Sequence, residues 1–397
     1  MANVIEQFET QEVKHFIEAH INDNAKELAL KFRGKVSFDI NIVSSQIELW
    51  QHAKKKLPTW CAANALFTKL MYEQCTSEKV AQYKSTLFSG KKLLDATAGS
   101  GVDAFFIGKN FKDVTMLETD YSKVKFLEYN FKKLKPPFKY NIKNTDAESW
   151  LHSNNDYDLI YIDPDRRDEN KNRNILFELC SPDLMKIVDI LNFSIASVAV
   201  KLSPLLDLQY IIKKLQPTQI ICIAEHNEMK EILVVINKSK RGEETSISAV
   251  NIEKESNTTY IHTALKIKRN NTSEKYFYEC GNAIIKANLC DSYFNHLDIE
   301  PQNMNATFGT ANHFNSGFIG RKFLILEQST FSQKLLSLAI AKYKIEKCNI
   351  TCRDFVLTPV EILKKNKLKD GGDLYLFFTR NKKGEKIFFV TTTVRNL

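Results

Sequence analysis

The stretch LLDATAGSGVDAFF, residues 93–106, decides the fold of this 397-residue chain. It predicts a strand that ends at Asp95, a tight turn through Gly99 and Gly101, and a helix behind the turn. Glycine can adopt positive φ or let the backbone approach a ligand closely. The first N–H groups of the helix have no partner within it, so they can bind a polar ligand. The spacing is DxxxGxG, which differs from the GxGxxG of dinucleotide-binding folds.

Short apolar runs recur on the C-terminal side of this stretch, with segments between them that are long enough for helices. The runs are LLDAT, VTMLET, DLIYID, SVAVKL, IICIAE and EILVVI, and the expected helices cover 101–109, 121–134, 173–191 and 204–215. Such alternation predicts a parallel sheet with helices on both faces. Only residues 226–230 separate the last two runs, too few for a crossover helix, so these runs are expected to form an antiparallel hairpin.

The flanking regions predict further domains. Residues 1–85 have helical apolar spacing and form an expected helical N-terminal region, followed by the α/β domain at 86–240. Residues 241–320 are expected to hold connecting strands and a small domain. Residues 321–397 are expected to form a compact α/β unit, because FLILEQ, CNITCRDF, LYLFFTR and KIFFVTTT alternate with two helical segments.

Composition excludes several classes. The chain is 43% hydrophobic and 26% charged, as in ordinary globular proteins. It has no apolar run near 18 residues and no signal-peptide pattern at its start. The eight cysteines include no CxxC pair, and no histidine pair has metal-ligand spacing. We therefore expect a reduced, cytoplasmic protein without a metal or a membrane span.

Acidic residues end four successive strand regions: Asp95, Glu118, Asp146 and Asp163. The carboxyl ends of parallel strands are where open α/β sheets bind ligands. A carboxylate at Glu118 can accept hydrogen bonds from both hydroxyls of a ribose, and one at Asp146 can accept a bond from an adenine amino group. Four such residues in register point to one binding site rather than to four solvated strand ends.

These residues and the terminal hairpin resemble those of class I S-adenosylmethionine-dependent methyltransferases, over roughly residues 73–237. The resemblance implies that S-adenosylmethionine is the cofactor. It assigns the methionine moiety to Asp95 and the glycine turn, the ribose to Glu118, and the adenine to the start of the next helix. The implied cofactor-binding residues are Asp95, Thr97, Gly99, Gly101, Glu118, Asp146 and Ala147.

Other segments resemble an uncharacterised bacterial methyltransferase family with a THUMP-like C-terminal domain. They are EQCTSEKVAQYKS (73–85), YIDPDRRD (161–168), KLSPLLD (201–207), EHNEMKE (225–231) and KLKDGGDLYLF (367–377). This likeness implies a Rossmann-like methyltransferase sheet, a small ferredoxin-like insert near 277–318 and a THUMP-like α+β domain. THUMP modules are associated with RNA, so rRNA or tRNA is the implied partner.

The segment Asp163–Pro164–Asp165–Arg166 lies where amino-group methyltransferases carry a D/N-P-P-aromatic motif. A carboxylate and a neighbouring carbonyl can accept both N–H hydrogens of an exocyclic amine and orient its lone pair. Asp163, Pro164 and Arg166 are therefore the catalytic candidates. Asp165 and Arg166 depart from the motif, which disfavours adenine N6 and leaves guanine N2 as a guess; a guanidinium can stack on a base or bind a phosphate.

Lys201, in VKLSP at the end of the fifth expected strand, either serves the same cleft or forms a salt bridge with Asp163 or Asp165. The whole net charge of +9 belongs to residues 321–397, which hold 16 Lys and Arg against 7 Asp and Glu. This predicts a phosphate-binding surface with Lys364, Lys365 and Lys367 as candidates; the alternative is a lysine-rich solvated surface.

Two other function classes compete with a methyltransferase of structured RNA. A non-catalytic RNA-binding module that keeps the cofactor fold is the alternative, and Asp165 and Arg166 favour it. An NAD-linked oxidoreductase conflicts with the DxxxGxG spacing and with the terminal hairpin.

Overall fold

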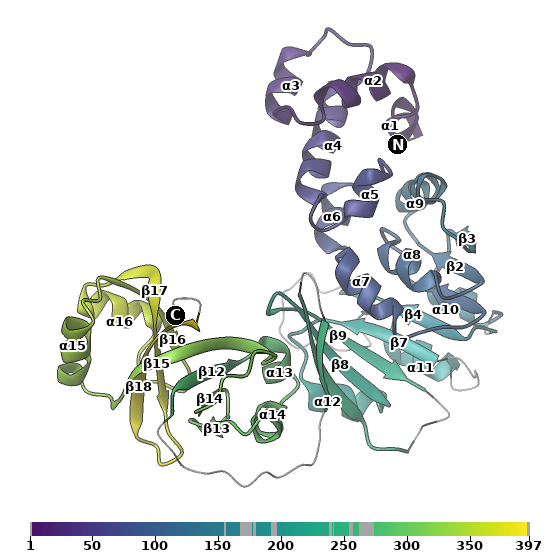
Figure 1. Cartoon of the computed structure of the whole chain (residues 1–397). Coiled ribbons are helices and arrows are strands. Elements are labelled where there is room, and N and C mark those ends of the chain that lie inside the picture. Colours follow the sequence, from purple (N-terminus) through teal and green to yellow (C-terminus); the bar gives the residue numbers. More distant parts are fainter. Residues whose placement is uncertain are drawn as a thin grey trace. The chain divides into compact units, whose positions relative to one another are not determined.

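The computed structural model describes residues 2–154, 156–166, 177, 180–191, 197–237, 240, 242–253, 257–261 and 274–394 (Figure 1). The chain divides into two compact units. The first unit contains Met1–Gln219 and Leu233–Thr245, and the second contains Ile220–Ile232 and Ser246–Leu397. No helix within the described ranges is both long and apolar enough to cross a membrane.

The N-terminal region is helical, as the sequence predicts. Its helices are α1 (Ala2–Gln7), α2 (Gln11–His20), α3 (Ala25–Lys31), α4 (Ile40–Ala53), α5 (Pro58–Ala62), α6 (Lys69–Gln74) and α7 (Glu78–Ser85). Most of them begin at a residue whose side chain accepts a hydrogen bond from a free N–H of the first turn; these caps are Thr10, Asn24, Asp39, Thr68 and Ser77. The caps account for where these five helices begin.

Trp60 and Asn130 make two of the contacts that join these helices to the α/β domain. Trp60 is buried, and its ring meets that of Phe105 edge-on with centroids 5.2 Å apart. The amide of Asn130 accepts from the N–H of Leu66 and donates to its carbonyl, at 2.8 Å each. Because Asn130 is buried on the helix behind the second strand, α5 and the segment that follows it are held against the sheet domain.

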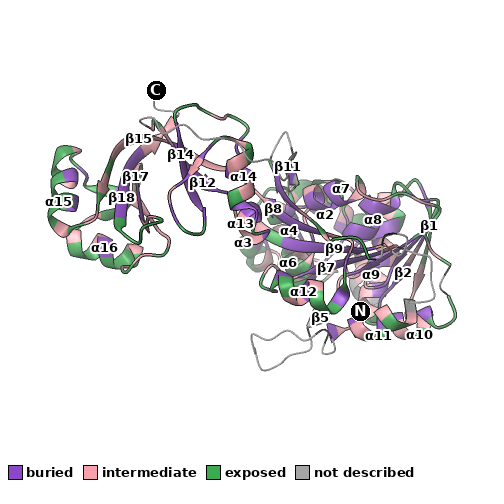
Figure 2. Ribbon diagram, turned by 90° about the horizontal axis from the view of Figure 1, so that it is seen from below, coloured by how far each residue is buried: buried purple, intermediate pink, exposed green. Residues whose placement is uncertain are grey.

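The large sheet has the order β11-β10-β8-β9-β7-β4-β1-β2-β3. Its strands are β1 (Lys92–Asp95), β2 (Asp113–Leu117), β3 (Lys139–Lys143), β4 (Leu159–Ile162), β7 (Ser197–Leu202), β8 (Gln219–Glu225), β9 (Glu228–Ile236), β10 (Ser246–Ile252) and β11 (Asn257–Ile261). Strand β1 pairs in parallel with β2 and β4, β2 with β3, and β4 with β7. Figure 2 shows how the buried residues concentrate on the central strands, and β4 is buried along its whole length. The predicted parallel sheet is confirmed.

The connecting helices are α8 (Val102–Gly108), α9 (Tyr121–Leu134), α10 (Ala147–Leu151), α11 (Leu184–Leu191) and α12 (Leu208–Leu215). The predicted helix at 173–191 is confirmed only over α11, and most of its N-terminal part lies outside the described residues. A short two-stranded sheet joins β5 (Asp165–Arg166) to β6 (Cys180–Ser181).

The terminal hairpin is tighter than predicted. His226 and Asn227 alone connect β8 to β9, with φ of 50° and 63°. Positive φ at both central residues is the geometry of a type I′ turn, whose twist suits a hairpin. Residues 228–230 therefore belong to β9 rather than to the turn, and β9 lies between β7 and β8.

The second unit contains a seven-stranded sheet of order β13-β14-β12-β15-β18-β17-β16. The strands are β12 (Tyr276–Cys280), β13 (Glu300–Pro301), β14 (Phe308–Ala311), β15 (Gly320–Thr330), β16 (Lys347–Cys352), β17 (Lys369–Arg380) and β18 (Lys386–Thr393). The helices are α13 (Asn282–Lys286), α14 (Cys290–His296), α15 (Gln333–Lys342) and α16 (Pro359–Asn366). The boundary expected at residue 320 falls at the start of β15, and strands from both sides of it pair in this one sheet.

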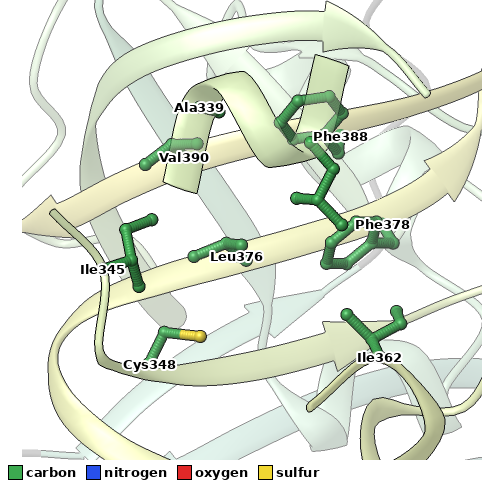
Figure 3. Packing of buried hydrophobic residues seen from close by; sticks show 9 residues of the cluster. Ala339, Ile345, Cys348, Ile362, Leu376, Phe378, Phe388 and Val390 are labelled. Atoms are coloured by element: carbon green, nitrogen blue, oxygen red, sulfur yellow. The ribbon is translucent and has the colours of Figure 1, made fainter. Parts of the chain in front are cut away.

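Apolar clusters cover both faces of this sheet. On one face, Leu376 and Phe378 of β17 pack with Leu336 of α15 and Ile362 of α16 (Figure 3). On the other face, the rings of Phe277 and Phe377 stack with centroids 4.4 Å apart. Two strands, β15 and β18, lie between the strands of these two phenylalanines. Because neighbouring strands are about 4.8 Å apart, the sheet must curve strongly around this second cluster.

Candidate functional site

A cavity of about 310 Å³ lies in the first unit at the carboxyl ends of β1, β2 and β4. The turn after β1 forms one wall, and the starts of α9 and α10 form another. Met71, Gln74, Cys75 and Thr76, from the end of the helical N-terminal region, contribute a third wall. Volumes of this order hold small organic ligands in proteins. The position is the one expected from the pattern of strand ends.

The glycine turn serves two different needs. Gly99 lines the cavity with a φ of 51°, and a Cβ there would meet only open space and one carbonyl at 3.9 Å. Gly101 has a φ of 80° and lies behind the turn, where an added Cβ would be 2.6 Å from Phe131 and 2.7 Å from Leu127. Gly101 therefore lets α8 start close to α9, whereas Gly99 shapes the cavity wall.

This difference predicts unequal effects of alanine at the two positions. Both variants place an L-residue in the left-handed region, but only Gly101→Ala also overpacks the core, which typically costs about 1–3 kcal/mol. We expect the free energy of unfolding in urea to fall by roughly that much more for Gly101→Ala than for Gly99→Ala. Equal losses would show that α9 moves away at no cost.

Asp95 lies at the floor of the cavity and is 2% exposed. Its Oδ1 accepts a hydrogen bond of 3.1 Å from the N–H of Thr97. Burial raises the pKa of Asp95 to about 8, and the nearby carboxylates of Asp103 and Asp163 act in the same direction. A cation in the cavity would reverse this effect, because it favours the ionised form.

Glu118 follows β2 and connects two parts of the wall. Its Oε2 accepts from the N–H of Gly99 at 3.1 Å, and its Oε1 accepts from the N–H of Asp120 at 2.9 Å. Each carboxylate oxygen can accept a further hydrogen bond. Glu118 is therefore held rigidly while both of its oxygens can still serve a ligand.

Asp146 and Ala147 lie at the start of α10. The Oδ1 of Asp146 accepts a hydrogen bond of 2.7 Å from the N–H of Ser149, and this bond lowers the pKa of Asp146. Both residues line the cavity, with Ala147 buried. Asp146 is thus an ionised helix cap beside the cavity.

Asp163 lies just after β4, and its N–H donates to the hydroxyl of Thr97 at 2.6 Å. Its carboxylate forms a hydrogen-bonded ion pair with Lys201 of β7. Burial raises the pKa of Asp163, and Lys201 opposes that effect. The salt bridge considered for Lys201 is therefore present, and its partner is Asp163. Asp165 also lines the cavity, Pro164 does not, and the side chain of Arg166 lies outside the described part of the structure.

A buried network that was not predicted from the sequence lies beside Asp95. The Nζ of Lys84, which is fully buried, is 2.8 Å from Oδ1 of Asp103 and 2.8 Å from the hydroxyl of Tyr161. The hydroxyls of Tyr161 and Thr76 each donate to Oδ2 of Asp103 at 2.9 Å. Asp103 already stands in the motif of residues 93–106, in the first turn of the helix. Its partner could not be identified from the local pattern, because Lys84 lies 19 positions before Asp103 in the sequence.

The lining of the cavity is strongly acidic. Eight acidic side chains reach it: Asp95, Asp103, Glu118, Asp120, Asp146, Glu148, Asp163 and Asp165. Lys84 pairs with Asp103 and Lys201 with Asp163, and among the described residues that line the cavity Lys123 adds one ammonium. Such a cavity favours a ligand that carries positive charge and repels a bare phosphate. The remaining candidates, Lys364, Lys365 and Lys367, are exposed at the end of α16 in the second unit.

Comparison with known proteins agrees with this geometry. The family described as conserved hypothetical protein 95 matches residues 70–197, and the family described as THUMP domain-like matches residues 320–393. A crystal structure of a candidate methyltransferase from Porphyromonas gingivalis W83 is 25% identical, with a TM-score of 0.80 over 96% of this chain and 98% of that chain. The chain has a class I methyltransferase fold and a THUMP-like domain.

Other solved methyltransferases match less of the chain. A candidate class I S-adenosylmethionine-dependent methyltransferase from Listeria monocytogenes is 10% identical, with a TM-score of 0.36 over 58% of this chain and 84% of that chain. A candidate methyltransferase from Escherichia coli is 19% identical, with a TM-score of 0.24 over 31% of this chain and 66% of that chain. None of the curated proteins matches the chain significantly. Among the described residues, no group of three or more His, Cys, Asp or Glu side chains could hold a metal ion.

Proposed function

We propose that this chain is a cytoplasmic S-adenosylmethionine-dependent methyltransferase that methylates a base amino group of structured RNA, with guanine N2 as the first candidate. The observation that carries the proposal is the acidic cavity at the carboxyl ends of a sheet with methyltransferase strand order. S-adenosylmethionine carries a sulfonium and an ammonium group, so its charge complements the lining. The THUMP-like domain and the basic C-terminal segment support RNA as the partner.

The residues present fit this cofactor. Asp95 would hold the ammonium of the methionine moiety beside the Thr97–Gly99 turn, Glu118 the ribose hydroxyls, and Asp146 with Ala147 the adenine. Both oxygens of Glu118 keep acceptor capacity, and Gly99 leaves open space at the wall. When bound, the cofactor supplies an electrophilic methyl group.

Asp163 is the residue proposed to act on the substrate amine. Its carboxylate and the carbonyl of Pro164 would accept the two N–H hydrogens, which localises the nitrogen lone pair for attack. Lys201 favours the ionised form of the Asp163 carboxylate and so opposes the effect of burial, which raises the pKa. Arg166 is proposed to contact a base or a phosphate of the RNA.

Nucleoside mass spectrometry of total RNA tests the function. RNA from a strain without the gene should lack one modified nucleoside that is present in the wild type, and the purified protein should restore it with S-adenosylmethionine. The identity of that nucleoside would establish the RNA, the base and the atom. Identical nucleoside profiles, together with no labelling of either RNA, would contradict the proposal.

A non-catalytic RNA-binding module is the second candidate. The ion pair between Asp163 and Lys201 favours it, because a paired carboxylate is less available to an amine. The two candidates differ in a simple measurement: only the methyltransferase requires tight binding of S-adenosylmethionine, which should raise the melting temperature.

Cofactor binding should release a proton. At pH 7.0 Asp95 is mostly protonated in the free protein, since its pKa is about 8. A bound ammonium favours the carboxylate, so we expect up to one proton to leave on binding. Calorimetric titrations in phosphate and in Tris, whose ionisation enthalpies differ, would measure this release. Equal binding heats in the two buffers would show that Asp95 does not receive the ammonium.

A further inference from the structure

An arginine pair in the second unit surrounds one buried carboxylate. Glu279 of β12 is opposite Arg321 of β15 in the sheet, and the two side chains form a hydrogen-bonded ion pair. Arg353, just after β16, places a guanidinium nitrogen 3.6 Å from the other carboxylate oxygen. The Glu279 side chain is 6% exposed, whereas those of Arg321 and Arg353 are 39% and 38% exposed.

The pair carries more positive charge than the carboxylate needs. One guanidinium neutralises Glu279, so the second is an excess charge at a partly buried position. The Nε of Arg353 is buried, and within the described residues it has no hydrogen-bond partner. A buried N–H without an acceptor is costly. Because this Nε is shielded from solvent, an acceptor from outside the chain would bind the exposed part of the Arg353 guanidinium.

The surroundings hold the guanidinium of Arg321 in place. Its carbon lies 5.7 Å from the ring centre of Phe323, 5.9 Å from that of Tyr375 and 5.7 Å from that of Phe377. It also donates to the hydroxyl of Thr351 at 3.0 Å. A guanidinium fixed by rings and by a carboxylate loses little conformational entropy when it binds a ligand.

We infer that Arg321 and Arg353 form a binding site for a phosphate of the RNA backbone. The inference rests on the proposed function for the nature of the polymer. Two guanidinium groups present planar N–H donors that match phosphate oxygens. They also supply positive charge for a phosphate, which the acidic cavity of the first unit does not. The excess of +9 over residues 321–397 agrees with a polyanionic partner.

This site differs from the lysines predicted from sequence. Lys364 and Lys365 are exposed in the last turn of α16, and Lys367 follows that helix. Such side chains act as mobile point charges, whereas Arg321 is oriented by Glu279, by Thr351 and by three aromatic rings. The arginine pair should therefore position the RNA, and the lysines should add to a general attraction.

The test is filter binding of the full chain to end-labelled fragments of total bacterial RNA between 50 and 200 mM salt. Arg353→Gln removes the excess charge but leaves Glu279 paired with Arg321. We expect RNA affinity to fall about tenfold and the slope of log affinity against log salt to decrease by about 1. Lys342→Gln is the matched control, because it removes one charge at the exposed end of α15, where Lys342 pairs with Glu327. The RNA affinity of this control should stay within about twofold of the wild-type value.

Equal affinities of Arg353→Gln and Lys342→Gln would overturn the inference. Arg353→Lys, which keeps the charge, should lose an intermediate amount of affinity, and it replaces the glutamine variant if that variant does not fold. The binding of S-adenosylmethionine by the same proteins separates this result from the proposed function. That binding should be unchanged in all three variants, and its absence from the wild type would contradict the proposed function instead.

Discussion

Replacing Asp95 with alanine is expected to weaken S-adenosylmethionine binding about 100-fold or more. Asp95 is buried where it lines the cavity, and its carboxylate is the group proposed to pair with the ammonium of the ligand. Truncating one partner of a buried, hydrogen-bonded charge pair typically costs about 2–5 kcal/mol, and about 1.4 kcal/mol corresponds to a factor of ten. Isothermal titration calorimetry would measure the loss directly.

Two variants make this result interpretable. Asp113→Ala removes an exposed carboxylate at the start of β2 and should leave binding within about twofold. Asp95→Asn keeps an acceptor for the N–H of Thr97 but not the charge, so it should bind as poorly as the alanine variant. Unchanged affinity in Asp95→Asn would show that the carboxylate charge is not used.

The asparagine variant also reports on the pKa of Asp95. This carboxyl ionises at 3.8 when unperturbed and at about 8 in the folded chain, so the folded state holds the proton more tightly. As the pH rises between these two values, the free energy of unfolding of the wild type should fall relative to that of Asp95→Asn. Above pH 8 the difference between the two proteins should become constant.

Lys84→Met is expected to lower the free energy of unfolding by about 3–5 kcal/mol. The fully buried ammonium of Lys84 pairs with Asp103, and methionine would leave that carboxylate buried with only two hydroxyl donors. Burial alone would raise the pKa of Asp103, but the ammonium groups of Lys84 and Lys201 outweigh this effect and the pKa lies below its ordinary value. The pair therefore stabilises the fold at neutral pH and loses its effect in acid. Urea unfolding at pH 7 would measure the change.

An exposed ion pair serves as the control. The Nζ of Lys92 lies 2.6 Å from Oδ2 of Asp156 at the surface. Lys92→Met should change the free energy of unfolding by less than about 1 kcal/mol. Adding Asp103→Leu to Lys84→Met should recover part of the loss, since the uncompensated charge is then gone. If the double variant is as unstable as the single one, packing rather than charge is the cause.

The architecture of the methyltransferase domain was predictable because its signals are local. The run of residues 93–106, the apolar strands and the short link before β9 each depend on neighbouring residues, and the structure has the predicted sheet. Asp95, Thr97, Gly99, Glu118, Asp146, Ala147 and Asp163 all line one cavity, as the positions of the strand ends imply. Their roles toward a ligand stay predictions.

Long-range pairing was not predictable in the same way. Lys84 lies on a helix among polar residues, and such a lysine usually faces solvent; only Asp103 and Tyr161 explain its burial. The contact of Glu279 with Arg321 spans 42 positions, and nothing in either local pattern points to the other. Tertiary packing, rather than periodicity, determines both contacts.

The pairing of β12 with β15 limits how this chain can be divided or recombined. A fragment that starts near residue 320, where the THUMP-like match begins, would lack β12 and expose the backbone edge of β15. The fragment would also lose Glu279, the partner of Arg321, and the Phe277 ring of the aromatic cluster. A transferable module that keeps the proposed RNA-binding site would therefore have to begin upstream of Tyr276. The unit that evolution or a protein engineer can move is thus larger than the unit that sequence similarity outlines.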